Sequence, residues 1–375
     1  MCVFCCNFVP DLCSNWMKRI IGIGLLVCCF CVIRAQEVLI LPYEASSLTE
    51  EQKAMNPERL AYPTEMKETI LKEVNFECTP QEVELGPFSV SAFNMVYFSP
   101  GNLQFNAMLG THQCKDGTSQ KGTWRFAEHQ WDYVGDKDNG TVKEGGTKCD
   151  NSKINATYNG WIDLFGWGTS GWDSGANAYK PYATSEKDKD YCPGGYDNTN
   201  LTGTYANADW GVYNQIGSSP AGKWRTLTKD EWMYVLHERS DANALRALGT
   251  VNGVLGLILL PDHYAFPSGV TYTSGNDKGF DTNVYNTEQW AKFEEKGAVF
   301  LPAAGIRGGT TVEEVMDYGA YWSASYNTNY KSNAWYVAFV SQAGGTSNIG
   351  RHMGFSVRVV KDVEFEPVPT ELKKK

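Results

Sequence analysis

The chain has 375 residues, with 33 Lys and Arg against 43 Asp and Glu, and a formal net charge of −10. This acidic balance argues against nucleic acid and against an anionic membrane surface as partners. Hydrophobic residues make up 42% of the chain and aromatic residues 13%, which provides the apolar material for one large globular domain or two.

The N-terminal region, residues 1–35, predicts a secretory signal peptide whose true start is Met17. A basic start (MKR) is followed by an apolar run over residues 20–33, and Ala35 supplies the small residue before a cleavage site. The apolar run is about 14 residues long, shorter than the roughly 18 that a membrane span requires. We therefore expect a mature chain that begins at Gln36, is secreted or held at the cell surface, and has no membrane insertion after signal cleavage.

Seven of the 11 cysteines lie in residues 1–35, and loss of this region leaves 30 basic and 42 acidic side chains, a formal charge of −12. In an oxidising compartment the four other cysteines pair in one of three ways. A bridge between Cys114 and Cys149, both in polar, glycine-rich stretches, is the first expectation. No CxxC spacing occurs, so neither a zinc site nor redox exchange is indicated. The four cysteines are Cys78, Cys114, Cys149 and Cys192.

Composition divides the mature chain into three parts. Residues 36–86 are charged and contain four prolines, which indicates an appendage or linker. Residues 87–361 carry the strand-like patterns and form the core domain, and residues 362–375 form a polar, mobile tail. Long loops are expected over residues 109–123 and 135–159, where Gly, Asn, Asp and Thr dominate.

Two helices have clear start signals in the core domain. Thr228 and Glu231 form a capping box for a helix that reaches about residue 239. Asn286 and Gln289 begin a second helix that ends before Gly297. Short helices among many short strands and long loops predict an α+β fold. The expected strands cover residues 88–91, 95–98, 103–105, 254–260, 298–301, 320–325, 334–340 and 354–360.

Four phrases of the core domain carry a family resemblance. They are WRTLTKDEW at residues 224–232, LPAAGIR at 301–307, YWSAS at 321–325 and GFSVR at 354–358. In this order they resemble the sulfatase-modifying-factor branch of the C-type lectin-like fold, where the first phrase opens a helix packed on the sheet and the last two bracket the terminal strands. The resemblance spans roughly residues 88–360 and implies a C-type lectin-like domain with short helices, short twisted antiparallel strands and long loops.

Three further phrases resemble a group of large, paralogous exported proteins of gut Bacteroidetes. They are WRFA at residues 124–127, GWIDLFGWG at 160–168 and VFLPAAG at 299–305. Enzymes of the wider sulfatase-modifying-factor branch oxidise a cysteine in sulfatases with a reactive cysteine pair near their own C-terminal end. This chain has no cysteine after Cys192, so the resemblance does not imply that activity, because a thiolate is needed as nucleophile and metal ligand.

The resemblance also implies where a ligand binds. In the similar variable proteins that retroelements diversify, the segment matching residues 322–354 presents changeable side chains on a stable scaffold. Aromatic faces there would supply contact area, and polar groups would fix the orientation of a ligand. The candidate ligand-binding residues are Tyr326, Asn327, Asn329, Tyr330, Trp335, Asn348, Arg351 and His352.

Motifs for nucleotide and metal binding are incomplete. GSSPAGK at residues 217–223 lacks the hydroxyl side chain that a phosphate loop needs, because Trp224 stands in its place, and it predicts a turn. The stretch DKDNG at residues 136–140 has oxygen ligands suited to calcium, but not the spacing of a calcium loop. No cofactor is therefore required, and a structural calcium ion stays an open alternative.

Charged side chains near the phrases have ordinary interpretations. His129 and Asp132, three residues apart, are expected to share a hydrogen bond rather than a metal. Arg225 and Arg307 are expected to tie loops to the core. No residue is assigned a catalytic role, and no metal ligands are assigned.

The sequence supports three functions. The first is an exported, non-catalytic protein that binds a glycan or a surface protein. The second is an enzyme that keeps the scaffold with altered chemistry, which predicts a deep pocket lined by convergent groups of shifted pKa. The third is a structural component of a surface fibre, in which residues 36–86 dock as a strand.

Overall fold

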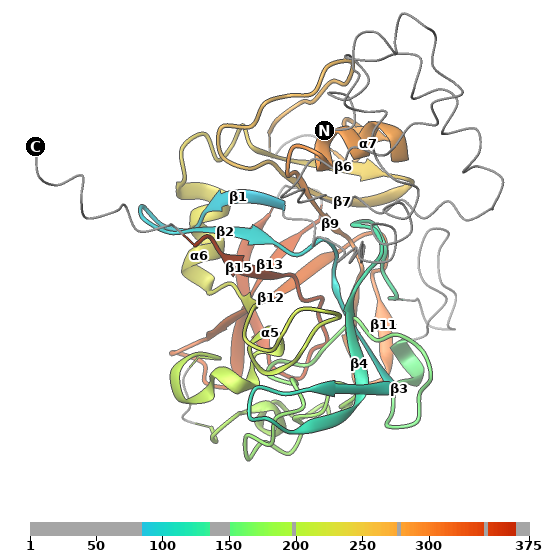
Figure 1. Ribbon diagram of the computed structural model, residues 1–375, viewed down its shortest axis with the longest axis vertical. Helices are drawn as coiled ribbons and strands as arrows, with labels where there is room; N and C mark the ends of the chain where they lie inside the picture. Colours follow the sequence, from blue (N-terminus) through green and yellow to red (C-terminus); the bar gives the residue numbers. More distant parts are fainter. Residues whose placement is uncertain (1–84, 136–150, 197–199, 276–278, 341–343, 365–375) are drawn as a thin grey trace, which may run out of the picture. The chain divides into compact units, whose positions relative to one another are not determined.

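The computed structural model describes residues 85–135, 151–196, 200–275, 279–340 and 344–364. These residues form a mixed α/β structure with many short strands, few short helices and small, largely antiparallel sheets (Figure 1). The α+β prediction is confirmed at this level. The predicted signal peptide, the linker up to residue 84, the stretch 136–140 and the tail from residue 365 lie outside the described residues.

Strands make up most of the secondary structure, and they are β1 (Leu85–Ser89), β2 (Met95–Phe98), β3 (Leu103–Gln113), β4 (Ser119–Phe126), β5 (Arg225–Thr226), β6 (Arg246–Val251), β7 (Val254–Leu259), β8 (Val284–Tyr285), β9 (Val299–Pro302), β10 (Ile306–Gly308), β11 (Thr311–Glu313), β12 (Gly319–Tyr326), β13 (Asn333–Phe339), β14 (Gly345–Gly350) and β15 (Val359–Asp362). Two sheets have four strands, in the orders β1-β2-β15-β5 and β8-β6-β7-β9. A three-stranded sheet has the order β12-β13-β14, and β3-β4 and β10-β11 are hairpins. Only the β6–β8 pair among the described strands is parallel.

Helical segments are short, and they are η3 (Asn151–Lys153), η4 (Asp188–Tyr191), η5 (Gly203–Ala208), α5 (Trp210–Tyr213), α6 (Lys229–Met233), η6 (Tyr234–Glu238) and α7 (Thr287–Glu294). Both predicted capping boxes are present, Thr228 with Glu231 before α6 and Asn286 with Gln289 before α7. The first helix is shorter than predicted as an α-helix, because η6 continues it as a π-helical turn. In the described part of the chain, no helix has the length and apolar character to span a membrane.

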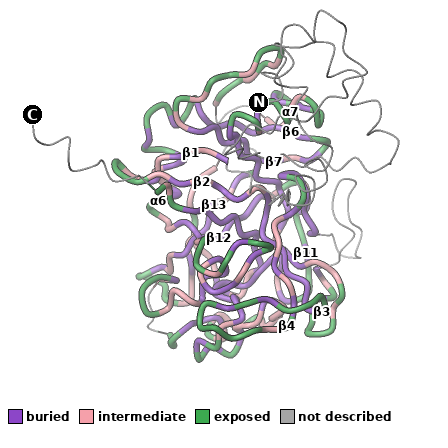
Figure 2. The backbone as a smooth tube through the Cα atoms, viewed as in Figure 1, coloured by how far each residue is buried: buried purple, intermediate pink, exposed green. Residues whose placement is uncertain are grey.

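The three-stranded sheet separates two apolar clusters of the core. Along β13, Ala334 and Tyr336 pack into one cluster, whereas Val337 and Phe339 pack into the next. Side chains alternate between the two faces of a strand, so β13 is buried on both sides. Figure 2 shows β12 and β13 running largely buried through the centre of the described residues.

Strand β7 separates the second cluster from a third in the same way. Leu257 and Leu259 face the cluster that contains Phe339, and Ile258 faces the cluster that contains Trp290 of α7. In the core, three apolar clusters therefore alternate with two sheets. The first cluster holds several buried tryptophans, including Trp124 of β4, Trp167 and Trp210 of α5.

The loop predicted over residues 109–123 is wrong, because most of this stretch belongs to the β3–β4 hairpin. His112 and Cys114 are buried, whereas Gln113 between them is exposed, which is the alternation of a strand. The turn contains Asp116 and Gly117, and Gly117 has a φ of 82°, in the region that favours glycine. The glycine-rich composition here reflects a tight turn rather than a long loop.

Two strands near the C-terminus also differ from the prediction. Strand β14 was not predicted, since its sequence is polar, and it forms by pairing with β13. The strand predicted over residues 354–360 is divided into single bridges at Gly354, Phe355 and Ser356 followed by β15. In both cases, pairing with neighbouring segments determines where a strand forms, rather than the local pattern of apolar residues.

The cysteines within the described residues, Cys114 and Cys192, are free and buried. The expected bridge from Cys114 to Cys149 is therefore not formed, and Cys149 and Cys78 lie outside the described residues. Burial is the main cause that raises the pKa of both thiols above the usual value. Both are protonated at neutral pH and pack as small apolar side chains.

Candidate functional site

The candidate residues gather at one end of the three-stranded sheet. Tyr326 at the end of β12 pairs with Ala334 of β13, and Asn333 pairs with Gly350 at the end of β14. The turn 327–332 and residues 351–352 therefore lie at the same end of the sheet. We call Tyr326, Asn329, Tyr330 and His352 the sheet-end surface.

Asn327 holds the turn between β12 and β13 in one conformation. Its Oδ1 accepts hydrogen bonds from the backbone N–H groups of Asn329 at 2.8 Å and Tyr330 at 3.2 Å. Its own backbone N–H donates to the carbonyl of Asn333 at 2.9 Å. Asn327 is buried, so it shapes the turn and is not available to a ligand.

Arg351 lies beneath the sheet-end surface. Its guanidinium carbon is 4.5 Å from the ring centroid of Trp167 and 5.5 Å from that of Tyr326, and the side chain is fully buried. Its backbone N–H donates to Ser332, and its carbonyl accepts from Trp167. Burial lowers the pKa of Arg351 below the usual value, while nearby Cys192 and Tyr326 oppose that change. Arg351 joins the central loop to the sheet and does not face a ligand.

Trp335 and Asn348 lie on the opposite face of the sheet from Tyr326. They are directly paired across β13 and β14, so their side chains share a face. The ammonium of Lys229, at the start of α6, is 4.8 Å from the centroid of the Trp335 ring. Asn348 accepts a hydrogen bond from Asn333 Nδ2 at 2.9 Å. Both residues are half-buried beside α6, away from the sheet-end surface.

His352 is held against a neighbouring loop. Its Nδ1 lies 2.6 Å from Oδ1 of Asp188 in η4, and both side chains are partly exposed. Asp188 also accepts a weaker hydrogen bond from the backbone N–H of His352 at 3.4 Å. The pair fixes the direction of the imidazole at the edge of the sheet-end surface.

Asn329 and Tyr330 are the most exposed of the eight candidates. Tyr330 is 66% exposed, and Asn329 is also classed as exposed. The structure therefore brings Tyr326, Asn329, Tyr330 and His352 together at the sheet end, with Asn327 and Arg351 as their buried support. It does not bring Trp335 and Asn348 to the same surface.

Other charged residues have the roles that the sequence suggests. His129 Nδ1 is 3.1 Å from Asp132 Oδ2, an ordinary hydrogen-bonded pair. Arg307 is fully buried and donates to the carbonyls of Leu164, Gly309 and Ala183, which ties three segments together. Within the described ranges, no three His, Cys, Asp or Glu side chains form a group suited to a metal ion.

Arg225 pairs with two carboxylates at the edge of the β1-β2-β15-β5 sheet. It donates to Glu231 at 2.8 Å and to Asp362 at 2.7 Å. Glu231 is also the capping-box residue of α6, so the arginine joins the helix start to β15. Arg225 is therefore structural, as predicted.

A second candidate site, which the sequence analysis did not predict, is a cavity between the β3–β4 hairpin and residues 170–182. His112, Gln120 and Trp124 come from the hairpin, and Lys180 and Tyr182 come from the facing loop. The sequence signal that could have indicated the hairpin is the Asp116-Gly117 pair, which is typical of a tight turn between two strands. The facing loop has no regular pattern, so its approach to the hairpin is a tertiary effect.

Comparison with known proteins gives no assignment for either site: no family model matches the chain, and neither the curated proteins nor the solved structures contain a match.

Proposed function

We propose that this chain is an exported, non-catalytic binding protein with a C-type lectin-like fold, and that its sheet-end surface recognises a glycan or a surface protein. The fold proposal is supported by the order of the sequence phrases and by the positions of their elements. The phrase 224–232 opens α6, which contacts β12, β13 and β14, and the phrase 321–325 lies in β12. The proposal that the protein is exported is supported by the signal pattern of residues 17–35.

The binding proposal rests on one observation: the tip of the turn 327–332 is exposed, whereas its base is buried and held by hydrogen bonds. Tyr330 is 66% exposed, while the backbone on which it stands is fixed by the buried Asn327 side chain. A large aromatic side chain on a preformed turn offers contact area at a small entropy cost, because few torsions have to be ordered on binding. Exposed aromatic residues of this kind dominate many binding energies.

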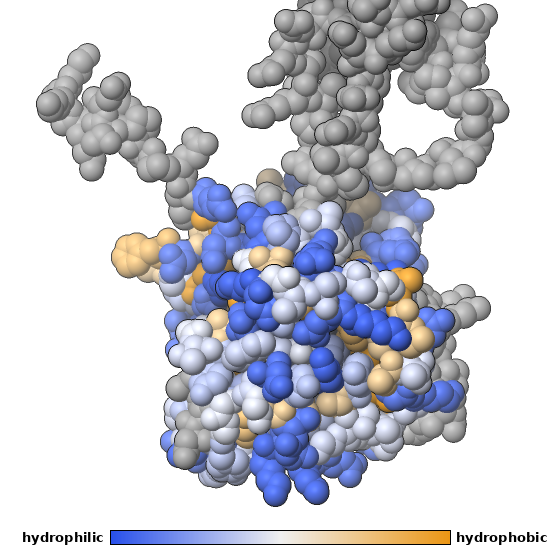
Figure 3. Space-filling model, turned by 60° about the horizontal axis from the view of Figure 1, so that its bottom comes forward, coloured by the Kyte–Doolittle hydropathy of each residue, from blue (hydrophilic) through white to orange (hydrophobic). Residues whose placement is uncertain are grey.

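The surroundings of the turn favour a polar ligand. The turn residues beside Tyr330 are polar, namely Thr328, Asn329, Lys331 and Ser332. On the face of the molecule drawn in Figure 3, apolar residues form small, scattered patches. The turn itself therefore offers no broad apolar interface, and a glycan or a polar protein surface would match it.

The experiment starts from the full chain expressed in a Gram-negative host, from whose periplasm the protein should be recovered with Gln36 as its first residue. Wild type and Tyr330→Ala are then applied to a glycan array and to an array of cell-surface proteins. We expect the variant to bind the wild-type ligand at least about 30-fold more weakly, as for a central aromatic contact.

The matched control is Phe93→Ala, because Phe93 is 87% exposed in the turn between β1 and β2. Phe93→Ala should bind like wild type, and both variants should keep the wild-type melting temperature. Equal binding by Tyr330→Ala and wild type, or no wild-type binding on either array, would contradict the proposed site.

A further inference from the structure

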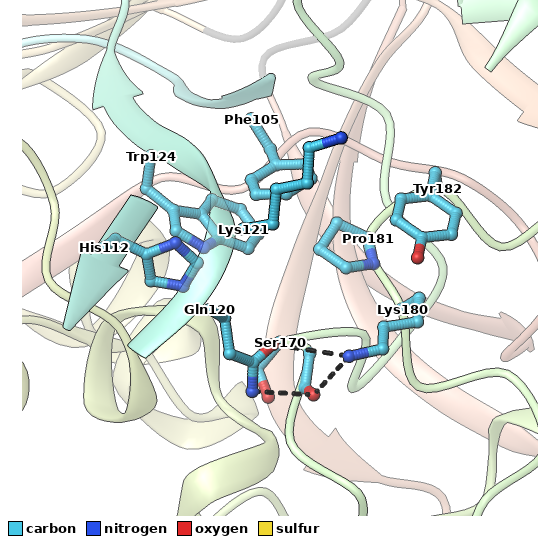
Figure 4. Close-up of a pocket in the computed structure, with 10 residues that line it drawn as sticks. Phe105, His112, Gln120, Lys121, Trp124, Ser170, Lys180, Pro181 and Tyr182 are labelled. Carbon is cyan, nitrogen blue, oxygen red and sulfur yellow. Dashed lines mark hydrogen bonds between the residues drawn. The ribbon is translucent and has the colours of Figure 1, made fainter. Parts of the chain in front are cut away.

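The cavity beside the β3–β4 hairpin is crossed by hydrogen bonds between its own walls. Figure 4 shows Gln120 of β4 facing Lys180 of the loop, and Lys180 Nζ donates to Gln120 Oε1 and to the carbonyl of Gly171, both at 3.3 Å. Gln120 Nε2 in turn donates to the Tyr213 hydroxyl at 3.1 Å. These side chains are engaged within the fold, whereas β14 has backbone groups that point away from it.

Two residues of β14 direct their backbone groups away from β13. In an antiparallel ladder, successive residues of a strand point their N–H and C=O groups to alternate sides. Asn333 of β13, which is paired with Gly350, uses its carbonyl on the β12 side, where it accepts from Asn327. The alternation along the ladder therefore points the backbone groups of Thr346 and Asn348 to the outer edge of the sheet.

These outward groups have no hydrogen-bond partner among the described residues. The next outward carbonyl along the strand, that of Gly350, accepts from the backbone N–H of Met353 at 3.2 Å. The free edge is therefore short: it consists of two N–H and two C=O groups, on Thr346 and Asn348.

The other outer strands of the larger sheets are short, interrupted or covered. Strands β5 and β8 have two residues each, and β1 and β9 contain Pro87 and Pro302. On the other side of the three-stranded sheet, Ala320 and Trp322 of β12 hydrogen bond with Ser356. Features of this kind prevent a strand edge from pairing with another chain.

Strand β14 has none of these features. Its sequence, GTSNIG, contains neither a charged residue nor a proline, and Ser347 at its centre is exposed. A row of free N–H and C=O groups at the spacing of a strand matches the backbone of another extended strand, because each group then finds its complement. The edge is therefore suited to a polypeptide strand.

We propose that the outer edge of β14 pairs with β14 of a second copy of this chain, in antiparallel register with Ser347 at the two-fold axis. Thr346 of each copy then lies opposite Asn348 of the other, and the two pairs form four backbone hydrogen bonds. The result is a continuous sheet of six strands, three from each copy.

This register is the one that uses the free groups of both residues. A two-fold axis at Asn348 would pair Thr346 with Gly350, whose carbonyl already accepts from Met353. With the axis at Ser347, two small, exposed side chains meet in the pair where strands approach most closely. The strand is uncharged, so identical copies place no like charges opposite each other.

The pairing has a consequence for the sheet-end surface. Strand β14 runs toward that surface, and its antiparallel partner runs the other way, so the dimer would carry its two sheet-end surfaces at opposite ends of the shared sheet. Such a dimer could link two ligand-bearing surfaces. The dimer itself does not depend on the proposed binding function, because its test involves no ligand.

Sedimentation equilibrium of the purified chain tests the dimer, at about 0.15 M salt to screen the repulsion between two acidic chains. We expect a Kd on the order of 100 µM, because the paired edge is short and the interface is small. Ser347→Lys places two ammonium groups opposite each other and should raise this Kd at least about fivefold. Thr311→Lys, at an exposed residue of β11, is the matched control and should behave like wild type.

A disulfide tests the register. Directly opposite residues of a non-hydrogen-bonded pair have Cα atoms about 4.5 Å apart, within the range that a disulfide spans. In a buffer of reduced and oxidised glutathione, two Cys thiols of Ser347→Cys should form one disulfide, with oxidised glutathione reduced to two thiols. Covalent dimer should form at least about tenfold faster than with Thr311→Cys or wild type, as seen on non-reducing gels.

Melting curves establish that each variant is folded. A wild-type chain that stays monomeric at several times the expected Kd would overturn the dimer. Dimerisation that Ser347→Lys leaves unchanged would overturn the role of β14, and equal cross-linking of Ser347→Cys and Thr311→Cys would overturn the register. A weaker dimer in Ser347→Lys together with selective cross-linking in Ser347→Cys supports the proposal.

Discussion

The sheet-end surface and the cavity beside the β3–β4 hairpin differ in how their polar groups are satisfied. At the sheet end, Asn327 bonds to the turn, His352 pairs with Asp188, and Arg351 stacks on two rings. In the cavity, the hydrogen-bond partners of Lys180 within the described ranges are neutral, and the Trp124 N–H has no partner there. The turn at the sheet end is therefore held by its own hydrogen bonds, whereas the Trp124 indole beside the cavity is buried without an acceptor.

The two regions therefore show different features: an exposed side chain on a fixed turn, and a buried polar group without a hydrogen-bond partner among the described residues. A satisfied surface binds through the shape and area that it presents, so its key residue is the exposed Tyr330. Beside the cavity the polar groups are partly or fully buried, so a change in them affects the stability of the fold. Three predictions test this contrast through stability rather than through binding.

The largest expected effect separates two basic residues, one from each region. Arg351→Met should lower the free energy of unfolding by about 2 kcal/mol, since a buried cation loses its contacts with Trp167 and Tyr326. Lys180→Met should change the free energy of unfolding by no more than about 0.5 kcal/mol, or increase it, because its ammonium is poorly compensated. Urea denaturation followed by tryptophan fluorescence measures both. Equal losses for the two variants would remove the contrast.

A smaller effect is expected within the turn of the sheet-end surface. Asn327→Ala should lower the free energy of unfolding by about 1 kcal/mol, because two backbone N–H groups lose their acceptor. Asn329→Ala is the matched control, since Asn329 is exposed and joins this network through its backbone, and it should stay within about 0.5 kcal/mol of wild type. The same urea titrations apply. If both alanine variants have the same stability, the turn is not held by Asn327.

The smallest effect is a pH dependence in the wall of the cavity. Burial lowers the pKa of His112 below 6.5, and the two hydrogen bonds to Gly122 and Asn214 oppose this without cancelling it. The folded protein then binds the proton less readily than the unfolded chain. The stability that the folded protein gains from neutral His112 is fully present above about pH 6.5 and is lost as the pH falls below that value.

His112→Gln removes this titration and keeps a polar side chain of similar size. The variant should therefore lose less stability than wild type between about pH 7.5 and about pH 5.5. Melting temperatures at the two pH values measure the change, and subtraction of the variant from wild type removes the contribution of all other groups. An identical pH dependence in the two proteins would show that His112 has an ordinary pKa.

Local signals in the sequence predicted the parts of the fold that depend on few neighbours. The capping boxes at Thr228 and Asn286 determine their helices through contacts within one turn, and both are present. Strand β14 is polar and forms only because β13 lies beside it, so no local pattern indicated it. The hairpin turn at Asp116 and Gly117 was predicted as loop because its glycines and polar residues also fit a long loop.

The candidate site was predicted in part for the same reason. The chain order of the phrases located the turn 327–332, and Tyr330 is exposed there. Burial of Arg351 and Asn327 depends on Trp167 and on the path of the turn, neither of which is visible in residue types alone. The cavity at Lys180 depends on two segments that are about 60 residues apart in the chain and meet only in the folded protein.

The burial of β13 on both faces has a consequence for how this protein would diversify. A strand packed between two core clusters leaves no face on which a changed side chain escapes contact with the interior. Inherited substitutions would therefore survive mainly in the turns at its ends, where Asn329 and Tyr330 project into solvent. A lineage of such proteins would exchange ligands by altering a few turn residues, while the layered interior that supports them stays the same.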